Sequence, residues 1–262
     1  MRSLNTGATG MLAQQLNVEV ISNNIANMST TGFKRQRAEF QDLLYQNLRR
    51  PGVTSSDANT IVPSGIQIGV GVRAAGVYRI NEQGNLTSTG NPYDIAISGK
   101  GYFQITLPSG ETAYSRAGSF QLDPTGNIVT ADGYTLQPGI TVPQGALSVN
   151  IDATGIVEAQ IAGQAQPQQL GQIQLATFVN EAGLDAQGDN LFLETAASGQ
   201  PTVGNPNAIG FGSLRQGYLE TSNVNPVQEI TNLISAQRAY EMNSKVITTS
   251  DEMLQVSSRL KS

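Results

Sequence analysis

The sequence predicts an α+β fold in which helices from the two ends of the chain form a coiled coil and the middle forms an antiparallel, glycine-turn-rich β domain. Three observations lead there. Proline is absent from both terminal stretches, apolar residues recur in them at helical spacing, and the middle holds short apolar segments between turn formers. We expect a helical domain from 1–30 with 226–262, an extended connecting segment over 31–70, and a β-rich domain over 71–225.

The N-terminal segment is expected to be a helix. No proline occurs between Ser3 and Asn27, and the turn-forming run from Met28 to Gly32 ends the pattern. An apolar column at about 3.6-residue spacing is widened by further apolar positions, so the apolar arc is broader than one core face requires. Neighbours on more than one side are therefore expected. The column is Leu4, Ala8, Met11, Val18 and Ile25, widened by Leu12, Leu16 and Ile21.

The C-terminal segment is expected to be a longer helix. Asn225 suits the N-cap and Pro226 the first turn, and neither proline nor glycine follows. Two apolar columns with a seven-residue repeat are typical of a helix that lies along a partner helix. From periodicity alone, a helical hairpin within one domain and a coiled coil between subunits remain equally open. The columns are Leu233, Tyr240, Ile247 and Leu254, then Ala239, Val246, Met253 and Leu260.

The middle of the chain is expected to form an antiparallel sandwich or barrel-like domain. Three segments, 81–86, 123–128 and 152–157, share an Asp or Asn, a glycine three residues later and a following apolar residue, which predicts hairpin turns. Residues 46–63 fit neither period and exceed the usual loop length, so this segment is either functional or disordered. The strand candidates are 66–72, 95–97, 102–107, 120–122, 128–130, 147–151, 156–161 and 173–179.

The composition excludes several kinds of chemistry. The chain has no His and no Cys, so Ser-His-Asp and Cys-His catalysis and His-based zinc sites are ruled out. Charged residues make up 13% and the net charge is −5, which gives no attraction to nucleic acid. No apolar run is long enough to enter a membrane, and the N-terminus lacks a cleavable signal peptide. We expect no nucleic-acid partner and no direct membrane insertion.

No motif rises above background as an active site. Asp123-Pro-Thr-Gly and Asp152-Ala-Thr-Gly each carry one residue too many for an aspartic-protease loop. Gly99-Lys100 lacks the Ser or Thr of a phosphate loop. Asp123, Asn127 and Asp132 lack the acidic ligand set of a known calcium loop. We therefore predict no catalytic residue, no cofactor and no metal site, and a protein that is not an enzyme.

The ends of the chain resemble the bacterial flagellar rod and hook axial proteins. The resemblance rests on four motifs and covers essentially the whole chain, most loosely over 198–211. Within the family, the distal-rod branch is the nearest, on residues 42–52, 66–73 and 101–104 and on overall length. The four motifs are LNTGATGM at 4–11, NNIANMSTTGFK at 23–34, QGYLETSNVN at 216–225 and QRAYEMNSKV at 237–246.

The resemblance implies a structural subunit of the distal rod. Such proteins polymerise helically into a straight hollow drive shaft that transmits torque from motor to hook and conducts exported subunits. The implied partners are further copies of the chain, proximal rod proteins, the hook protein, the outer ring (bushing) proteins and the type III export apparatus. The implied location is the basal body, in a rod spanning periplasm to outer membrane, reached without a cleaved signal peptide. A proximal rod or hook subunit, or a secreted β-rich hydrolase or binding module, remain the alternatives.

The resemblance also implies roles for particular residues. The intersubunit coiled-coil positions would be Leu4, Met11, Val18, Ile25, Leu233, Tyr240, Ile247 and Leu254. The turn out of the first helix would be fixed by Asn23, Asn24, Asn27, Gly32 and Phe33. A segment linked to straightness of the shaft would include Gln46, Arg50, Pro51, Gly52 and Pro63.

Overall fold

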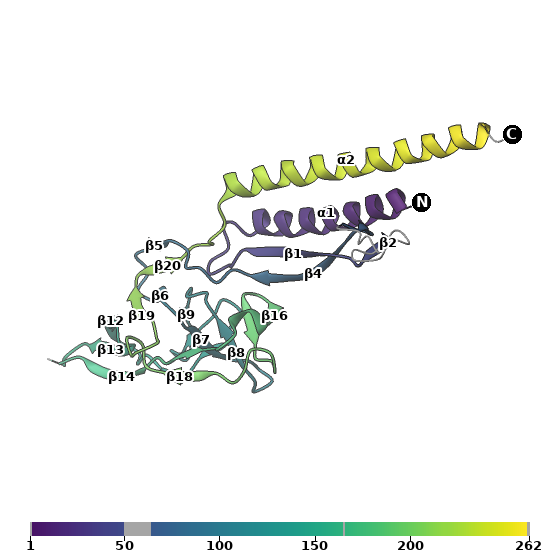
Figure 1. Ribbon diagram of the computed structural model, residues 1–262. Helices are drawn as coiled ribbons and strands as arrows, with labels where there is room; N and C mark the ends of the chain where they lie inside the picture. The colour runs from purple at the N-terminus through teal and green to yellow at the C-terminus, as the bar shows by residue number, and fades with distance from the viewer. Residues whose placement is uncertain (1, 50–63, 165, 261–262) are drawn as a thin grey trace. The chain divides into compact units, whose positions relative to one another are not determined.

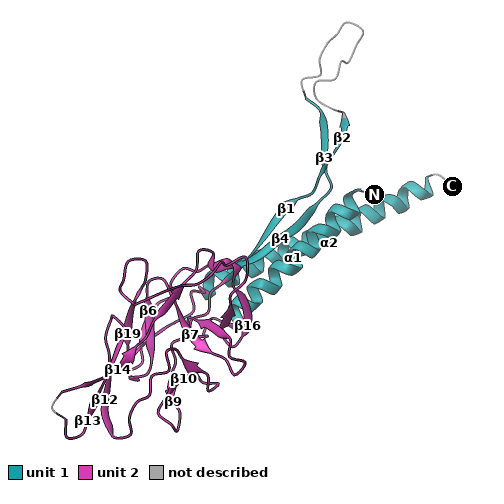
Figure 2. Cartoon of the chain, turned by 90° about the horizontal axis from the view of Figure 1, so that it is seen from below, with its two compact units in different colours: residues 1–25, 36–78, 226–262 teal, residues 26–35, 79–225 magenta. Residues whose placement is uncertain are grey.

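A computed structural model describes residues 2–49, 64–164 and 166–260, and it divides into two compact units (Figure 2). Unit 1 consists of residues 1–25, 36–78 and 226–262, and unit 2 of residues 26–35 and 79–225. Helices at both chain ends and antiparallel sheets between them confirm the predicted α+β class. The boundaries differ from the expected ones because the connecting segment is shared between the units.

Unit 1 is built around two long helices, α1 (Arg2–Ala26) and α2 (Pro226–Arg259). α1 lies between α2 and a ribbon formed by β1 (Gln36–Asp42) and β4 (Val72–Arg79) (Figure 1). Within α1 the buried apolar residues are Ala13, Val20 and Ile21, whereas Leu12 of the broad apolar arc stays 67% exposed. A second ribbon pairs β2 (Tyr45–Arg49) with β3 (Ile66–Gly69), with Tyr45 opposite Gly69.

The predicted strand over 66–72 is interrupted where the ribbon passes close to α1. β3 ends at Gly69, and Gly71 takes a φ of +129°, which an L side chain rarely adopts. A β-carbon at Gly71 would overlap the Thr9 hydroxyl, and the same hydroxyl accepts a 3.4 Å hydrogen bond from the Val72 amide. The glycine thus lets the backbone meet the helix.

Unit 2 contains a nine-stranded antiparallel sheet and three smaller sheets. In the large sheet the order is β16-β17-β8-β7-β11-β10-β9, with β15 pairing both β7 and β18. A three-stranded sheet runs β12-β13-β14, while β19 pairs β6 and β20 pairs β5. One cluster of buried apolar side chains, including Ile97, Phe103 and Leu175, joins the large sheet, the three-stranded sheet and the pair β19-β6. Two smaller clusters centre on Tyr102 and Ile105.

The strand bounds of unit 2 follow in chain order: β5 Leu86–Ser88, β6 Ile95–Ser98, β7 Tyr102–Thr106, β8 Thr112–Ser115, β9 Gln121–Leu122, β10 Ile128–Val129, β11 Thr135–Leu136, β12 Ala146–Ile151, β13 Ile156–Ile161, β14 Gln168–Gln172, β15 Leu175–Thr177, β16 Asp185–Gly188, β17 Leu191–Leu193, β18 Thr202–Gly204, β19 Ser213–Gln216 and β20 Tyr218–Glu220. A short 3-10 helix spans Glu181–Gly183.

Two of the three predicted hairpin turns are confirmed. Residues 123–127 connect β9 to β10, and residues 152–155 connect β12 to β13. In the first turn, Asp123 Oδ1 accepts hydrogen bonds of 2.8 Å from the amides of Thr125 and Asn127. The Thr125 hydroxyl and these amides hold the pKa of the Asp123 carboxyl below its usual range. The Asp therefore shapes a turn.

The prediction of a hairpin over 81–86 was wrong. β5 pairs with β20, from the far end of the chain, and not with β4. Gly84 lies against the Thr221 carbonyl, where a β-carbon would overlap the oxygen. A glycine needed for close approach by a distant strand has the same local signature as a turn glycine.

Candidate assembly surface

The two helices of unit 1 run antiparallel and approach through small and polar residues. On α2 the buried positions are Glu229, Ala236 and Ser250, which share a seven-residue spacing. On α1, a β-carbon at Gly7 would lie 3.0 Å from Ile247 Cγ1, and one at Gly10 would lie 2.8 Å from Asn243 Nδ2. The two glycines thus permit close packing, which leaves little room for large apolar side chains between the helices.

The predicted coiled-coil column of α2 flanks this contact. Ile247 reaches α1 beside Gly7, and Leu233 is half-buried, but Tyr240 and Leu254 remain 43% and 37% exposed. Their column lies four residues after the buried one, so the seven-residue repeat is present but a different column of α2 is buried. On α1, the four predicted positions are all half-buried: Leu4, Met11, Val18 and Ile25.

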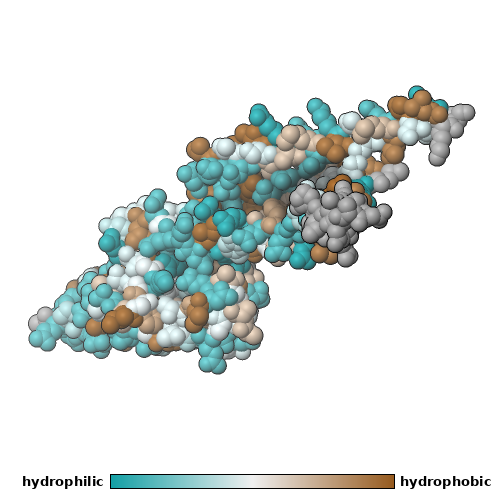
Figure 3. Space-filling model, viewed as in Figure 1, coloured by the Kyte–Doolittle hydropathy of each residue, from teal (hydrophilic) through white to brown (hydrophobic). Residues whose placement is uncertain are grey.

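Unit 1 exposes many large apolar side chains. They recur along α2 (Figure 3) and on the paired strands β2 and β3. Of these, Met242 and Met253 are each 61% exposed. Exposed apolar residues that continue along one element mark a surface that another molecule covers. The set on α2 is Val227, Ile230, Ile234, Tyr240, Met242, Val246, Met253, Leu254, Val256 and Leu260, and the set around β2 and β3 is Leu44, Tyr45, Leu48, Ile66 and Ile68.

Asn24 ties the three parts of unit 1 together. Its Oδ1 accepts a 2.8 Å hydrogen bond from the Gln36 amide, and its Nδ2 donates to the Gln36 carbonyl at 2.8 Å. The same Nδ2 donates to Glu229 Oε2 at 3.2 Å. Asn24 is therefore bound to β1 and to the first turn of α2, where a carboxylate also suits the helix dipole. Asn23 donates from Nδ2 to Gln36 Oε1 at 3.4 Å.

The remaining predicted turn residues belong to unit 2. Asn27 closes the turn by accepting hydrogen bonds from the amide and hydroxyl of Thr30 at 3.2 and 3.1 Å. Gly32 has a φ of +69°, and a β-carbon there would lie 2.8 Å from the Ala117 amide nitrogen. Phe33 is half-buried, and its carbonyl accepts a hydrogen bond from the Asn223 amide. The turn therefore requires glycine at position 32, because a β-carbon there would collide with the backbone at Ala117.

A buried group of three charges joins the two terminal motifs within unit 2. Glu220 accepts hydrogen bonds from Lys34 Nζ and Arg116 Nε, each at 2.6 Å, and all three side chains are buried. Glu220 Oε1 also accepts from the Gly84 amide at 2.9 Å. Burial alone would raise the pKa of Glu220, but the nearby Arg116 and Lys34 outweigh it and lower that pKa below its usual value. The glutamate therefore remains ionised.

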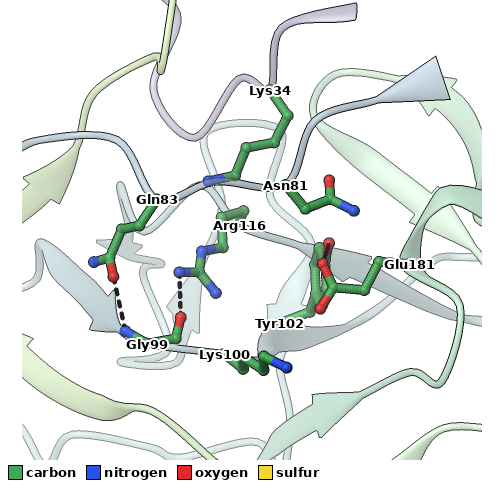
Figure 4. A pocket seen from close by; sticks show the side chains of 8 residues that line it. All are labelled: Lys34, Asn81, Gln83, Gly99, Lys100, Tyr102, Arg116 and Glu181. Carbon is green, nitrogen blue, oxygen red and sulfur yellow. Dashed lines mark hydrogen bonds between the residues drawn. The ribbon is translucent and has the colours of Figure 1, made fainter.

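The two cations of this group have further acceptors. Lys34 Nζ donates to the Glu82 carbonyl at 2.8 Å. Arg116 donates to the Gly99 carbonyl at 2.6 Å (Figure 4). Around them lies a polar cavity of about 360 Å³, in which Tyr102 donates its hydroxyl proton to Glu181 at 3.2 Å. Lys34, Arg116 and Glu220 therefore each have local partners, which fits a structural network. Sequence reasoning did not single out these three charged residues.

Asn223 was also missed, although it lies in a quoted motif. Its Oδ1 accepts from the Arg35 amide at 2.7 Å, and its Nδ2 donates to the carbonyls of Ile80 and Glu82. The motif around Glu220 and Asn223 therefore holds residues 80–84, the segment that leads into β5, in place. Because these segments are far apart in the sequence, no local periodicity could have revealed the role of Asn223.

The predicted straightening segment is only partly described. Gln46 lies in β2 opposite Ile68 of β3. The other four positions, Arg50, Pro51, Gly52 and Pro63, lie outside the described residues.

Over residues 2–49, 64–164 and 166–260, no three acidic side chains come together where they could hold a metal ion. None of the helices described has the length and apolarity needed to span a bilayer.

Three family models match the chain. "Flagella basal body rod protein" matches residues 4–34, "Flagellar hook protein FlgE/F/G D1 domain" matches 96–159, and "Flagellar basal body rod FlgEFG protein C-terminal" matches 215–260. The first and third cover most of α1 and α2, and the second covers the middle of unit 2. The matches thus fall in both units and at both ends of the chain.

Full-length relatives agree with these matches. The chain is 63% identical over 262 residues to "Flagellar basal-body rod protein FlgG" of Caulobacter vibrioides, covering 100% of both chains. It is 55% identical to the protein of the same name from Agrobacterium fabrum, covering 99% of both. Against "Flagellar basal-body rod protein FlgF" of Caulobacter vibrioides the identity falls to 32%, over 96% of this chain and 94% of the relative.

Proposed function

The chain belongs to the flagellar basal-body rod protein family, and from that premise we propose that it is a structural subunit of the distal rod of the bacterial flagellum. One observation carries the proposal: end-to-end identity of 63% to a FlgG rod protein, against 32% to the FlgF protein of the same organism. That difference favours the distal rod over another rod position. The relatives' names describe structural proteins, which also favours a protein that is not an enzyme.

In this proposal, copies of the chain assemble helically through unit 1 into a hollow, torque-bearing shaft. The exposed apolar residues of α2 support it, because their burial by neighbours would contribute roughly 25 cal/mol per Å². Contacts between different surfaces of successive copies do not close, and they therefore build a filament. The predicted interfacial positions on both helices remain part of the proposal, with Tyr240 and Leu254 as the exposed members.

We further propose the export route, the location and the partner proteins that this role requires. The chain would be exported through the flagellar type III apparatus without a cleaved leader and would sit in the basal body between periplasm and outer membrane. Its other contacts would be proximal rod proteins, the hook protein and the outer ring proteins. Within unit 1, terminal helices that gain most of their apolar burial from neighbours would fold as the subunit joins the rod.

The segment from Gln46 to Val62 is proposed to keep the shaft straight. Deleting it should give a bent, hook-like polymer, because the part of it that is described, in β2, exposes Leu48 beside exposed Ile66 and Ile68 of β3, and these side chains would have other copies to contact. Electron micrographs of isolated rods measure the curvature. A deletion variant that still builds a straight shaft would remove this part of the proposal.

Immunogold electron microscopy tests the proposed function itself. Hook–basal bodies are isolated, partly stripped of their outer rings and labelled with antibody against residues 96–205, which lie in unit 2. Label on the straight distal shaft is expected. Label on the curved segment would make the chain a hook-type subunit instead. A soluble protein with no label on the organelle would favour a secreted β-rich hydrolase or binding module.

A further inference from the structure

A shallow groove lies between α1 and α2 near the middle of both helices. Its volume is about 350 Å³, enough for a long side chain. Val18 and Tyr240 give it apolar walls, and Glu19 and Glu241 place two carboxylates at its sides, with no lysine or arginine among the lining residues. The lining residues are Gln15, Val18, Glu19, Gln237, Tyr240 and Glu241.

A basic stripe lies on a different face of α2. Arg238, Met242 and Lys245 are spaced i, i+4 and i+7, so they share one side of the helix. All three are exposed, and among the described residues neither cation of the stripe has an ion-pair partner. At 100° per residue, Arg238 lies about 160° around the helix from buried Ala236, so the stripe faces away from α1.

We propose that the acidic groove of one copy receives the basic stripe of α2 from a second copy. This inference rests on the proposed function, since it names the surfaces by which subunits meet. Met242 of the second copy enters the groove beside Val18 and Tyr240. Arg238 and Lys245, on either side of Met242, approach Glu19 and Glu241. The contact thus combines apolar burial at its centre with charge pairs at its rim.

Charge decides which surface fits the groove. Two grooves facing each other would bring four carboxylates together, and two stripes would bring four cations together, so a two-fold contact is disfavoured. Groove against stripe is attractive. Glu241 borders the stripe, but Tyr240 lies about 160° around α2 from Arg238, so the apolar wall of the groove and the stripe point in different directions. Each copy can therefore use both surfaces at once, and the series of copies stays open. An open series is what a shaft requires.

Engineered cysteines test the contact directly, because the chain has no cysteine of its own. A Val18→Cys, Met242→Cys variant of the full chain is expressed in flagellated cells whose own copy is deleted. Basal bodies are then isolated and mildly oxidised. The expected result is a ladder of disulfide-linked multimers on a non-reducing gel, absent from each single variant. The control pair is Val18→Cys with Val179→Cys, which places a more accessible thiol in unit 2.

Rods that contain the double variant but give no ladder would overturn the inference. A charge exchange decides the matter if the cysteine pair fails to assemble. Glu19→Lys with Glu241→Lys, and separately Arg238→Glu with Lys245→Glu, should each lower incorporation about tenfold or more. All four together should restore most of it. Reversals without effect, or a combination that restores nothing, would also overturn the inference.

These outcomes are separable from the proposed function. Rods that contain the chain while the charge reversals do nothing leave the structural role intact and remove only this contact. Absence of the unaltered chain from basal bodies would remove the structural role itself.

Discussion

Unit 2 encloses Ile97, Phe103 and Leu175 completely, whereas the largest described apolar side chains buried in unit 1 are Val20 and Ile21. The contrast is sharpest on α2, whose buried positions are Glu229, Ala236 and Ser250, while its methionines and many of its aliphatic residues face outward. Folding of an apolar chain is driven by area removed from water. Unit 2 removes that area by itself, and unit 1 leaves much of it exposed.

The comparison indicates that the two units of one chain are stabilised in different ways. Unit 2 resembles an ordinary antiparallel β domain with its own core. In unit 1 the contacts between α1 and α2 involve glycines and polar side chains, which fix geometry but bury little apolar surface. Substitutions in unit 2 should therefore lower the free energy of unfolding of the free chain, whereas substitutions in unit 1 should mainly weaken assembly.

The largest effect is expected from Phe103→Ala. Phe103 is fully enclosed and packs edge-on against Phe120 at a centroid distance of 5.1 Å. Truncation leaves a cavity, which should lower the free energy of unfolding of unit 2 by about 3–5 kcal/mol. Urea unfolding of the purified chain measures it. Leu12→Ala, at a 67% exposed position in unit 1, is the control and should change it by less than about 0.5 kcal/mol.

The next effect concerns the buried charges of unit 2. Glu220→Gln leaves Lys34 and Arg116 as cations without a buried anion, and removing one member of such a group costs about 3 kcal/mol. Urea unfolding again measures the change. Glu82→Gln is a matched control, because Glu82 pairs with Arg35 at 3.9 Å and is largely exposed, so the loss should be at most about 1 kcal/mol. Equal losses for both variants would contradict the structural role given to the buried group.

A smaller effect is expected from pH. The pKa of Glu220 is lowered in the folded chain, so its stabilising contribution is complete above the unfolded pKa of about 4.3 and is lost as pH falls through the folded value. Each unit of pKa difference corresponds to about 1.4 kcal/mol. Unfolding free energies measured from pH 5 downward should therefore fall more steeply for the unaltered chain than for Glu220→Gln. A parallel decline in the two proteins would show that Glu220 does not titrate as proposed.

The sequence contained enough to predict what local periodicity controls. The two terminal helices, the alternating middle and the turns at Asp123 and Asp152 each follow from a pattern within one segment, and the structure confirms them. The terminal motifs were also sufficient to identify the family. Periodicity did not reveal which face of α2 meets α1, because Ala236 and Ser250 give no apolar signal that distinguishes them from solvent-facing residues.

What the sequence could not show depends on segments that meet only in the folded chain. Lys34 and Glu220 are separated by 186 residues, and their charges look like ordinary surface charges until both are buried. The same holds for β5, whose partner β20 comes from the opposite end of the chain. A motif shared with a family marked these residues without explaining them. The structure supplies the reason, a buried network that joins the two terminal motifs.

The smallest effect on the stability of the free chain is expected on the exposed face of α2. This face tests most directly whether unit 1 leaves apolar side chains unburied. Met253→Ser combined with Val256→Ser changes two side chains that are 61% and 56% exposed. Because neither is buried by its own chain, the free energy of unfolding should change by less than about 0.5 kcal/mol. Incorporation into rods, measured by quantitative immunoblotting of isolated basal bodies, should nevertheless fall, since neighbours lose apolar contact area. Loss of stability in the free chain by more than about 1 kcal/mol would mean that this face already packs within one subunit, and unit 1 would then be as self-sufficient as unit 2.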